Sequence, residues 1–220
     1  NDCIWFLMIV RRFLSPSAIA GAVIVVAVAV FGGFLRGPLP VDTAVWSDFI
    51  DARTPAMNSI MAGVSWAFDP KRAVVLALVI ALVVWWLVKK VMHALYILCS
   101  VALSGVNGYI IKHIDGRARP DQSFWLISED SYSFPSGHAT AVTALVISLV
   151  LVLTMTRFGR RIRHLLWVAA IAIIAFIAVT RLYLGVHWVT DVLGGFGVGL
   201  GSSMILAPFM LGRSALRTAR

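Results

Sequence analysis

Six apolar stretches, each long enough to cross a lipid bilayer as a helix, constrain this chain more than any other feature of its sequence. A hydrocarbon core about 30 Å thick needs roughly 20 apolar residues, and shorter stretches suffice where flanking Lys and Arg side chains reach the interface. The predicted spans are residues 13–35, 71–89, 91–111, 138–156, 165–181 and 191–211. We therefore expect an all-α membrane protein with six transmembrane helices.

Composition excludes the other broad classes of protein. Hydrophobic residues make up 60% of the 220 residues and charged residues only 13%, whereas soluble domains carry about 25% charged residues. Disordered chains are polar and rich in charge. Two cysteines cannot build a disulfide scaffold, and no disulfide is expected because Cys3 lies on the predicted reducing side and Cys99 inside a span. No internal repeat or linker divides the sequence, so residues 1–220 are expected to form one domain.

The net charge of +9 is divided unevenly between the two sides of the predicted bundle. The side with the termini carries eleven Lys and Arg residues and one acid, Asp2, while the other side carries eight Lys and Arg residues and nine acids. The positive-inside rule then predicts cytoplasmic termini in a plasma or inner membrane, with the acidic side facing outward. The charge is explained by topology, so no nucleic-acid partner is expected, and the sequence predicts no particular oligomeric state.

A cleaved signal peptide is the alternative for the first span. Arg11 and Arg12 precede it, and Ala27-Val28-Ala29 resembles a cleavage site. However, the apolar stretch is about twice as long as the core of a signal peptide. Its loss would also leave five spans and break the charge pattern, so we expect the span to be retained.

The first outer segment, residues 37–70, predicts an amphipathic helix that lies in the outer interface. Thr54-Pro55 is typical of a helix start, and Asp48, Asp51 and Arg53 keep the preceding turns polar. Apolar residues then recur at helical spacing at Met57, Ile60, Met61, Val64 and Phe68. An ordinary packed loop is the alternative.

Three short patterns of polar residues fall on the predicted outer side. They read Lys112-x6-Arg119-Pro120, Pro135-Ser136-Gly137-His138 and Thr180-Arg181-x5-His187-x3-Asp191. Ionisable residues at the edge of a membrane are energetically expensive and indicate a functional site.

The residue types in these patterns suit phosphoryl transfer. His187 and Asp191 are four residues apart and so share a helix face, which lets the carboxylate take the proton of one ring nitrogen and leave the other free to attack. Pro135-Ser136 indicates a helix start, whose outward amides from Ser136, Gly137 and His138 would attract an anion. Three cations, Lys112, Arg119 and Arg181, would stabilise the charge on a transferring phosphoryl group.

The three patterns resemble the signature of the type 2 phosphatidic acid phosphatase superfamily, which reads K-x6-RP, PSGH and SR-x5-H-x3-D; Thr180 stands where serine is usual and keeps the hydroxyl. The resemblance implies that His187 is a nucleophile forming a phosphohistidine, that Asp191 orients it, and that His138 protonates the leaving oxygen and then activates water. It implies no metal and no other cofactor. It also implies a set of phosphate-binding residues: Lys112, Arg119, Arg181, Ser136 and Gly137.

The resemblance makes a lipid phosphate the expected substrate. A polyprenyl diphosphate of the undecaprenyl type is the leading candidate, because small members of the family often act on it. Phosphatidylglycerol phosphate and phosphatidic acid are the alternatives. A membrane lipid transporter is the alternative from another class, but the spans carry almost no ionisable residue at mid-depth and show no inverted repeat. A haloperoxidase, which shares the phosphate pocket, is disfavoured by the membrane-embedded chain.

Several other residues are assigned structural roles. Arg117 lies between the fixed positions of the first motif and is expected to be solvated or to contact lipid headgroups. His93 and His164 lack acidic neighbours and are expected to pack at the basic side. Residues 121–134 mix acids with aromatic side chains, which indicates either a substrate entrance or an interfacial loop. Close helix packing is predicted by the small residues of the last span: Gly195, Gly197, Gly199 and Gly201.

Overall fold

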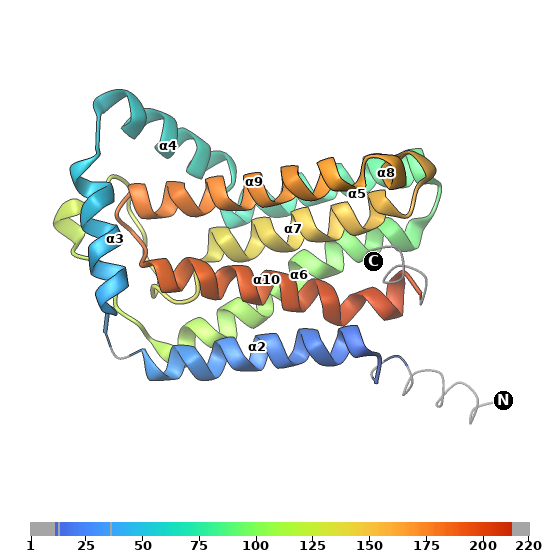
Figure 1. Cartoon of the computed structure of the whole chain (residues 1–220), viewed down its shortest axis with the longest axis horizontal. Coiled ribbons are helices and arrows are strands. Elements are labelled where there is room, and N and C mark those ends of the chain that lie inside the picture. Colours follow the sequence, from blue (N-terminus) through green and yellow to red (C-terminus); the bar gives the residue numbers. More distant parts are fainter. Residues whose placement is uncertain (1–11, 13, 36, 213–220) are drawn as a thin grey trace.

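Six long helices run side by side along the long axis of the molecule (Figure 1), and each is long and apolar enough to cross a membrane. They are α2 (Pro16–Phe34), α5 (Pro70–Val88), α6 (Val91–Asp115), α7 (Gly137–Thr154), α9 (Arg163–Tyr183) and α10 (Val189–Met210). The computed structural model describes residues 12, 14–35 and 37–212. The expected all-α fold with six candidate spans is confirmed. The expectations for Asp2, Cys3, Arg11 and the basic tail at 213–220 lie outside the described residues.

The largest difference from the predicted spans is at the end of α6, which continues four residues beyond 111 to Asp115. The prediction stopped at the first charged residue, but nothing in the sequence breaks the helix before Gly116. Gly116 adopts φ +59°, a left-handed conformation that ends helices and that glycine adopts without steric cost. Lys112 and His113 lie in the last turn, where positive charge is favourable. The extra turn holds Lys112 on a rigid helix.

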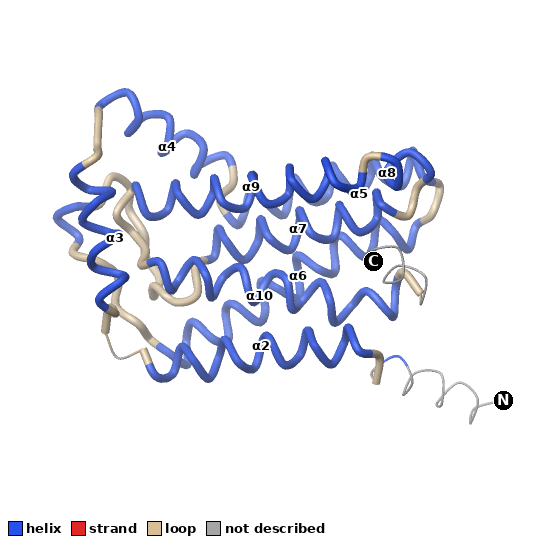
Figure 2. Tube along the Cα trace, in the orientation of Figure 1, coloured by secondary structure: helices blue, strands red, loops and turns tan. Residues whose placement is uncertain are grey.

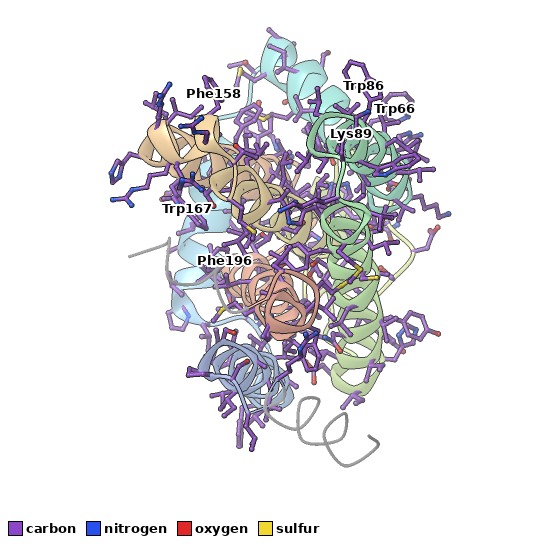
Figure 3. The ribbon with its side chains drawn as sticks, turned by 90° about the vertical axis from the view of Figure 1, so that its right-hand side faces the viewer. Trp66, Trp86, Lys89, Phe158, Trp167 and Phe196 are labelled. Atoms are coloured by element: carbon purple, nitrogen blue, oxygen red, sulfur yellow. The ribbon has the colours of Figure 1, made fainter. Side chains whose placement is uncertain are left out.

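Helices α7 and α10 form the centre of the bundle, and Figure 3 shows α10 end-on in its interior, with α2 beside it. Glycines allow this close approach, because a Cβ atom at Gly195 or Gly199 would lie 2.6 Å from a backbone oxygen of the α7 segment. On the other face of α10, a Cβ at Gly201 would lie 2.7 Å from the carbonyl of Gly21 in α2. The prediction of close packing by the last span is confirmed.

The first outer segment forms two helices, α3 (Pro40–Asp51) and α4 (Pro55–Ala67). Helix α3 crosses the ends of α9 and α10, and α4 lies against α9 (Figure 1). The predicted helix start at Thr54-Pro55 is confirmed, since Thr54 caps α4 by accepting from the amide of Met57. Asp48 and Asp51 are exposed and keep this part of the chain polar as expected, but they lie in a helix that the sequence did not predict. Helix α3 forms there because Pro40 opens it and Asp42, in its first turn, accepts from the amide of Leu39.

Among the described residues, the connections at the opposite end of the bundle are short turns (Figure 2) and the five-residue helix α8 (Arg157–Arg161). Its exposed side chains combine aromatic rings with basic groups, as Trp86, Lys89 and Phe158 illustrate in Figure 3. Lys89 ends α5 with φ 58° and lies 5.4 Å from the centre of the Trp86 ring. All acidic residues in the described part of the chain lie toward the end with α3, so the two ends differ strongly in charge.

Candidate active site

The three sequence motifs meet at the end of the bundle that α3 covers, where the longer loops also gather (Figure 2). A cavity of about 640 Å³ opens there. Five of the eight predicted site residues line it: Lys112, Arg119, Gly137, His138 and His187. Three more are buried behind its wall: Ser136, Arg181 and Asp191. The predicted residues are therefore brought together by the fold.

His187 lies in the tight connection between α9 and α10. Gly185 turns the chain there with φ +76°, and a Cβ atom in its place would lie 2.6 Å from the guanidinium of Arg53. The Nδ1 atom of His187 is 3.3 Å from Asp191 Oδ2, and its Nε2 atom is 3.1 Å from Arg119 Nη1. Because arginine only donates, this network assigns the ring proton to Nδ1 and the lone pair to Nε2.

The electrostatic surroundings keep the His187 ring neutral. The side chain is 1% exposed, and burial is the main cause that lowers its pKa well below the usual value. The nearby cations Arg119, Arg181 and Lys112 lower this pKa further. A neutral imidazole with its Nε2 lone pair directed at a cationic cluster is the form needed for attack on phosphorus.

Arg117 corrects one expectation from the sequence, because its side chain is buried rather than solvated. Its Nη1 atom donates to Asp191 Oδ1 (2.5 Å) and its Nη2 atom to Asp42 Oδ2 (2.8 Å), with the Arg117 side chain 2% exposed. Asp191 also accepts from Ser133 Oγ (2.5 Å) and from the amide of Trp188 (2.8 Å). Asp191 is thus held from three sides while it contacts His187.

Asp42 anchors this arrangement from α3 and was missed by the sequence analysis. It accepts from the amide and the hydroxyl of Thr190, and from the amide of Leu39 at 3.0 Å. Burial raises the pKa of Asp42, but the hydrogen bonds from Thr190, Leu39 and Arg117 outweigh it and lower the pKa below its usual value. Asp42 is therefore ionised at neutral pH and balances the charge of Arg117.

His138 occupies the first turn of α7 and faces α4. Its Nε2 atom lies 3.1 Å from the backbone oxygen of Ser65 and 3.3 Å from the Ser65 hydroxyl. That hydroxyl also accepts from Arg181. One feature of the sequence could have indicated a role for Ser65. It follows the apolar Met61 by four residues and so places a polar group on the face of α4 that is buried.

Two of the three cations share a carboxylate partner, and the third binds a backbone carbonyl. Lys112 donates to the carbonyl of Tyr132. Arg119 donates to the carbonyl of Ser131 (2.7 Å), and Glu129 contacts both Arg119 and Arg181. Lysine and arginine from three different segments thus surround the ring of His187.

The start of α7 differs from the expectation in one detail. The backbone amide of Ser136 donates to the carbonyl of Asp191 (2.9 Å), so it does not point outward. The amides left at the helix start are those of Gly137 and His138, which fits an anion site at the helix N-terminus. The hydroxyl of Ser136 is buried and has no partner among the described residues.

Known membrane phosphatases are similar to this chain in sequence. The model of the PAP2 superfamily matches residues 93–214. Phosphatidylglycerophosphatase B of Bacillus subtilis is 30% identical over 161 residues, which cover 72% of this chain and 78% of that protein. Lipid A 1-phosphatase of Rhizobium johnstonii is 33% identical over 51% of this chain and 46% of its own length. Undecaprenyl-diphosphatase of Sulfolobus acidocaldarius is 29% identical over 46% of this chain and 47% of its own length.

Solved structures share the fold. A transmembrane PAP2-type phosphatidylglycerolphosphate phosphatase from Bacillus subtilis has a TM-score of 0.76 at 24% identity, covering 89% of this chain and 96% of that one. LpxE of Aquifex aeolicus has a TM-score of 0.56 at 16% identity, covering 78% of this chain and 96% of that one. With the motifs gathered in one buried site and the family model matched over residues 93–214, we conclude that the chain belongs to the PAP2 superfamily of membrane lipid phosphatases.

Proposed function

We propose that the protein removes the phosphate of a glycerolipid phosphomonoester, with phosphatidylglycerol phosphate as the leading substrate. The resemblance of the sequence motifs alone makes a polyprenyl diphosphate the leading candidate and this lipid an alternative. The comparisons favour the alternative, because the relative aligned over 72% of the chain is named phosphatidylglycerophosphatase B. The undecaprenyl-diphosphatase aligns over 46% of the chain, which keeps the diphosphate as the second candidate.

The observation that carries the proposed chemistry is the placement of His187 between Asp191 and Arg119. In the first step Nε2 of His187 attacks phosphorus, and the bond from phosphorus to the lipid oxygen breaks. The proton on Nδ1 stays hydrogen bonded to Asp191, which stabilises the positive ring that forms. Lys112, Arg119 and Arg181 hold the three non-bridging oxygens, supported by the amides of the α7 start.

His138 completes the cycle as the acid and then the base. In the first step its protonated, imidazolium form gives a proton to the departing lipid oxygen, which leaves as an alcohol, and the His138 ring becomes neutral. In the second step it takes a proton from a water molecule, which attacks phosphorus and breaks the phosphorus–nitrogen bond. Inorganic phosphate and free His187 result. Every charge in this scheme is balanced by side chains of the protein, so we infer a metal-independent reaction.

The shape of the cavity supports a lipid substrate. Beyond the charged end the cavity continues along α6 and α7, where the residues that line it have small, uncharged side chains: Val101, Ser104, Gly105, Gly108, Thr140 and Ala141. From Lys112 to Val101 this lining extends roughly 16 Å along the helix axis, at 1.5 Å per residue. A phosphate at the charged end would leave its lipid chains beside this apolar wall.

The substrate is tested by measuring kcat/KM for phosphatidylglycerol phosphate, phosphatidic acid and undecaprenyl diphosphate in one detergent. We expect the highest value for phosphatidylglycerol phosphate, by more than about tenfold over the diphosphate, a difference of about 1.4 kcal/mol in transition-state binding. The variant His187→Ala is the blank for contaminating phosphatases. A preference for the diphosphate would restore the second candidate, and no turnover of any lipid phosphate would refute the proposed function.

We also propose that the active site faces away from the cytoplasm, because the opposite end carries the excess of Lys and Arg. Gln122 and Arg160 are exposed at the two ends and suit a labelling test. Gln122→Cys and Arg160→Cys are made separately in a background without Cys3 and Cys99. In intact cells an impermeant thiol reagent is expected to label position 122 and not position 160. After lysis the reagent is expected to label both positions. The reverse pattern would invert the topology.

A further inference from the structure

The carboxylate of Glu129 lies between two of the cations to which a phosphate-binding role is proposed above. Its Oε2 atom is 3.1 Å from Arg119 Nη2, and its Oε1 atom contacts Arg181 Nη2. The guanidiniums are 6% and 0% exposed and the Glu129 side chain 19%. One carboxylate therefore bridges both arginines at the edge of the cavity, as two oxygens of a phosphate would.

This contact competes with phosphate for the same donors. Arginine binds carboxylate and phosphate through the same planar fork of N–H groups. The other nitrogens of Arg119 already contact Ser131, Val186 and His187, so a phosphoryl group bound to Arg119 would take over the Nη2 atom that Glu129 uses. The Glu129 carboxylate left beside it would also repel it. We propose that Glu129 is an internal competitor that sets how tightly this site holds a phosphate.

The position of Glu129 in the chain allows such an exchange. It lies in the irregular segment between η1 (Gln122–Phe124) and α7, so no helix holds its backbone. By contrast, α9 carries Arg181, and two partners outside this segment, the carbonyl of Val186 and the ring of His187, hold Arg119. When phosphate arrives, the arginines stay in place and the carboxylate moves aside. When hydrolysis is complete, the carboxylate returns and helps inorganic phosphate to leave.

This role makes Glu129 a determinant of anion affinity. It weakens the binding of every phosphate-like anion by the cost of displacing the carboxylate. Weakly bound anions, such as the inorganic phosphate product, are then released rapidly, while a lipid phosphate gains additional binding from its chains. Product release limits the turnover of many enzymes, so Glu129 is expected to raise kcat at the expense of KM.

The test compares the variants Glu129→Gln and Asp130→Asn with the wild-type protein. Both remove one negative charge from the same loop, but Asp130 is exposed and belongs to none of the ion pairs in the described residues. The dissociation constant of orthovanadate, which adopts the geometry of a transferring phosphoryl group, is measured by calorimetry on purified protein. Binding of inorganic phosphate is measured in the same way.

We expect Glu129→Gln to bind orthovanadate about tenfold more tightly than the wild type, which corresponds to about 1.4 kcal/mol, and to lower both KM and kcat. Asp130→Asn is expected to change affinity less than twofold. If Glu129→Gln does not fold, Glu129→Ala carries the same expectation.

Unchanged or weaker vanadate binding by the folded Glu129 variant would overturn the competitor role and make Glu129 a residue that merely positions the arginines. A wild-type protein that binds no vanadate and hydrolyses no lipid phosphate would refute the proposed function itself.

Discussion

Replacing His187 with alanine is expected to lower the rate of phosphate release by at least about 10⁴-fold, because the variant loses the atom that attacks phosphorus. The Nε2 lone pair of His187 is the one that the network of Asp191 and Arg119 directs into the cationic cluster. Phosphate release from the lipid is measured under conditions where the wild type turns over fully. Rapid quenching is expected to trap an acid-labile phosphorylated protein in the wild type and none in the variant.

His164→Ala is the matched control for this experiment. It makes the same change at an exposed histidine at the opposite end of the bundle, and we expect wild-type activity from it. Retained binding of orthovanadate shows that the His187 variant is folded, since the cations that hold the anion are unchanged. Turnover within tenfold of the wild type by a folded His187→Ala protein would remove His187 from the role of nucleophile.

The second large effect is expected at Arg117. Arg117→Met leaves two buried carboxylates, Asp42 and Asp191, facing each other without the cation between them. Removing one partner of a buried ion pair costs about 3–5 kcal/mol of stability. Asp191 also loses one of the groups that hold it in place beside His187, so kcat is expected to fall more than about a hundredfold. The free energy of unfolding is measured by denaturant titration in mixed micelles, and kcat on the same preparation.

Two further variants make the result at Arg117 specific. Arg117→Lys keeps the charge but cannot donate to two carboxylates through a planar fork, so we expect values between wild type and Arg117→Met. Arg160→Met makes the same substitution at an exposed arginine and is expected to change stability by less than about 0.5 kcal/mol. If Arg117→Met behaves like Arg160→Met, the side chain is solvated, as the sequence alone had indicated.

The bundle and the motif residues were predictable from sequence for separate physical reasons. A helix that crosses a bilayer must be apolar over a fixed length, and this requirement is visible in a single stretch of sequence. His187 and Asp191 were expected to pair because residues four apart on a helix share a face. The structure brings them into contact at 3.3 Å, although His187 precedes the first residue of α10, Val189, and is not helical. The predicted ends of the six spans lie within four residues of the observed helix ends.

The partners from outside the motifs were not predictable in this way. Asp42 and Ser65 reach the site from α3 and α4, and their contacts depend on how those helices cross the end of the bundle. An aspartate in the first turn of a helix is ordinarily a capping residue, and Asp42 does cap α3 while it also binds Arg117. Arg117 itself looked solvated, because the motif spacing gives no information about which face of the loop is buried.

The central position of α10 has a consequence for how the protein is made. Of the six spans, α10 leaves the ribosome last, yet it packs against α2, α6 and α7 and touches the first span backbone to backbone at Gly21 and Gly201. Until α10 is inserted, α2, α6 and α7 therefore lack the helix that packs against all three of them. Asp191 and Thr190 arrive on that helix, so a nascent chain halted before residue 189 would hold Arg117 without Asp191 and Asp42 without Thr190. The proposed catalytic site is completed only when α10 is inserted, in the same event that closes the bundle.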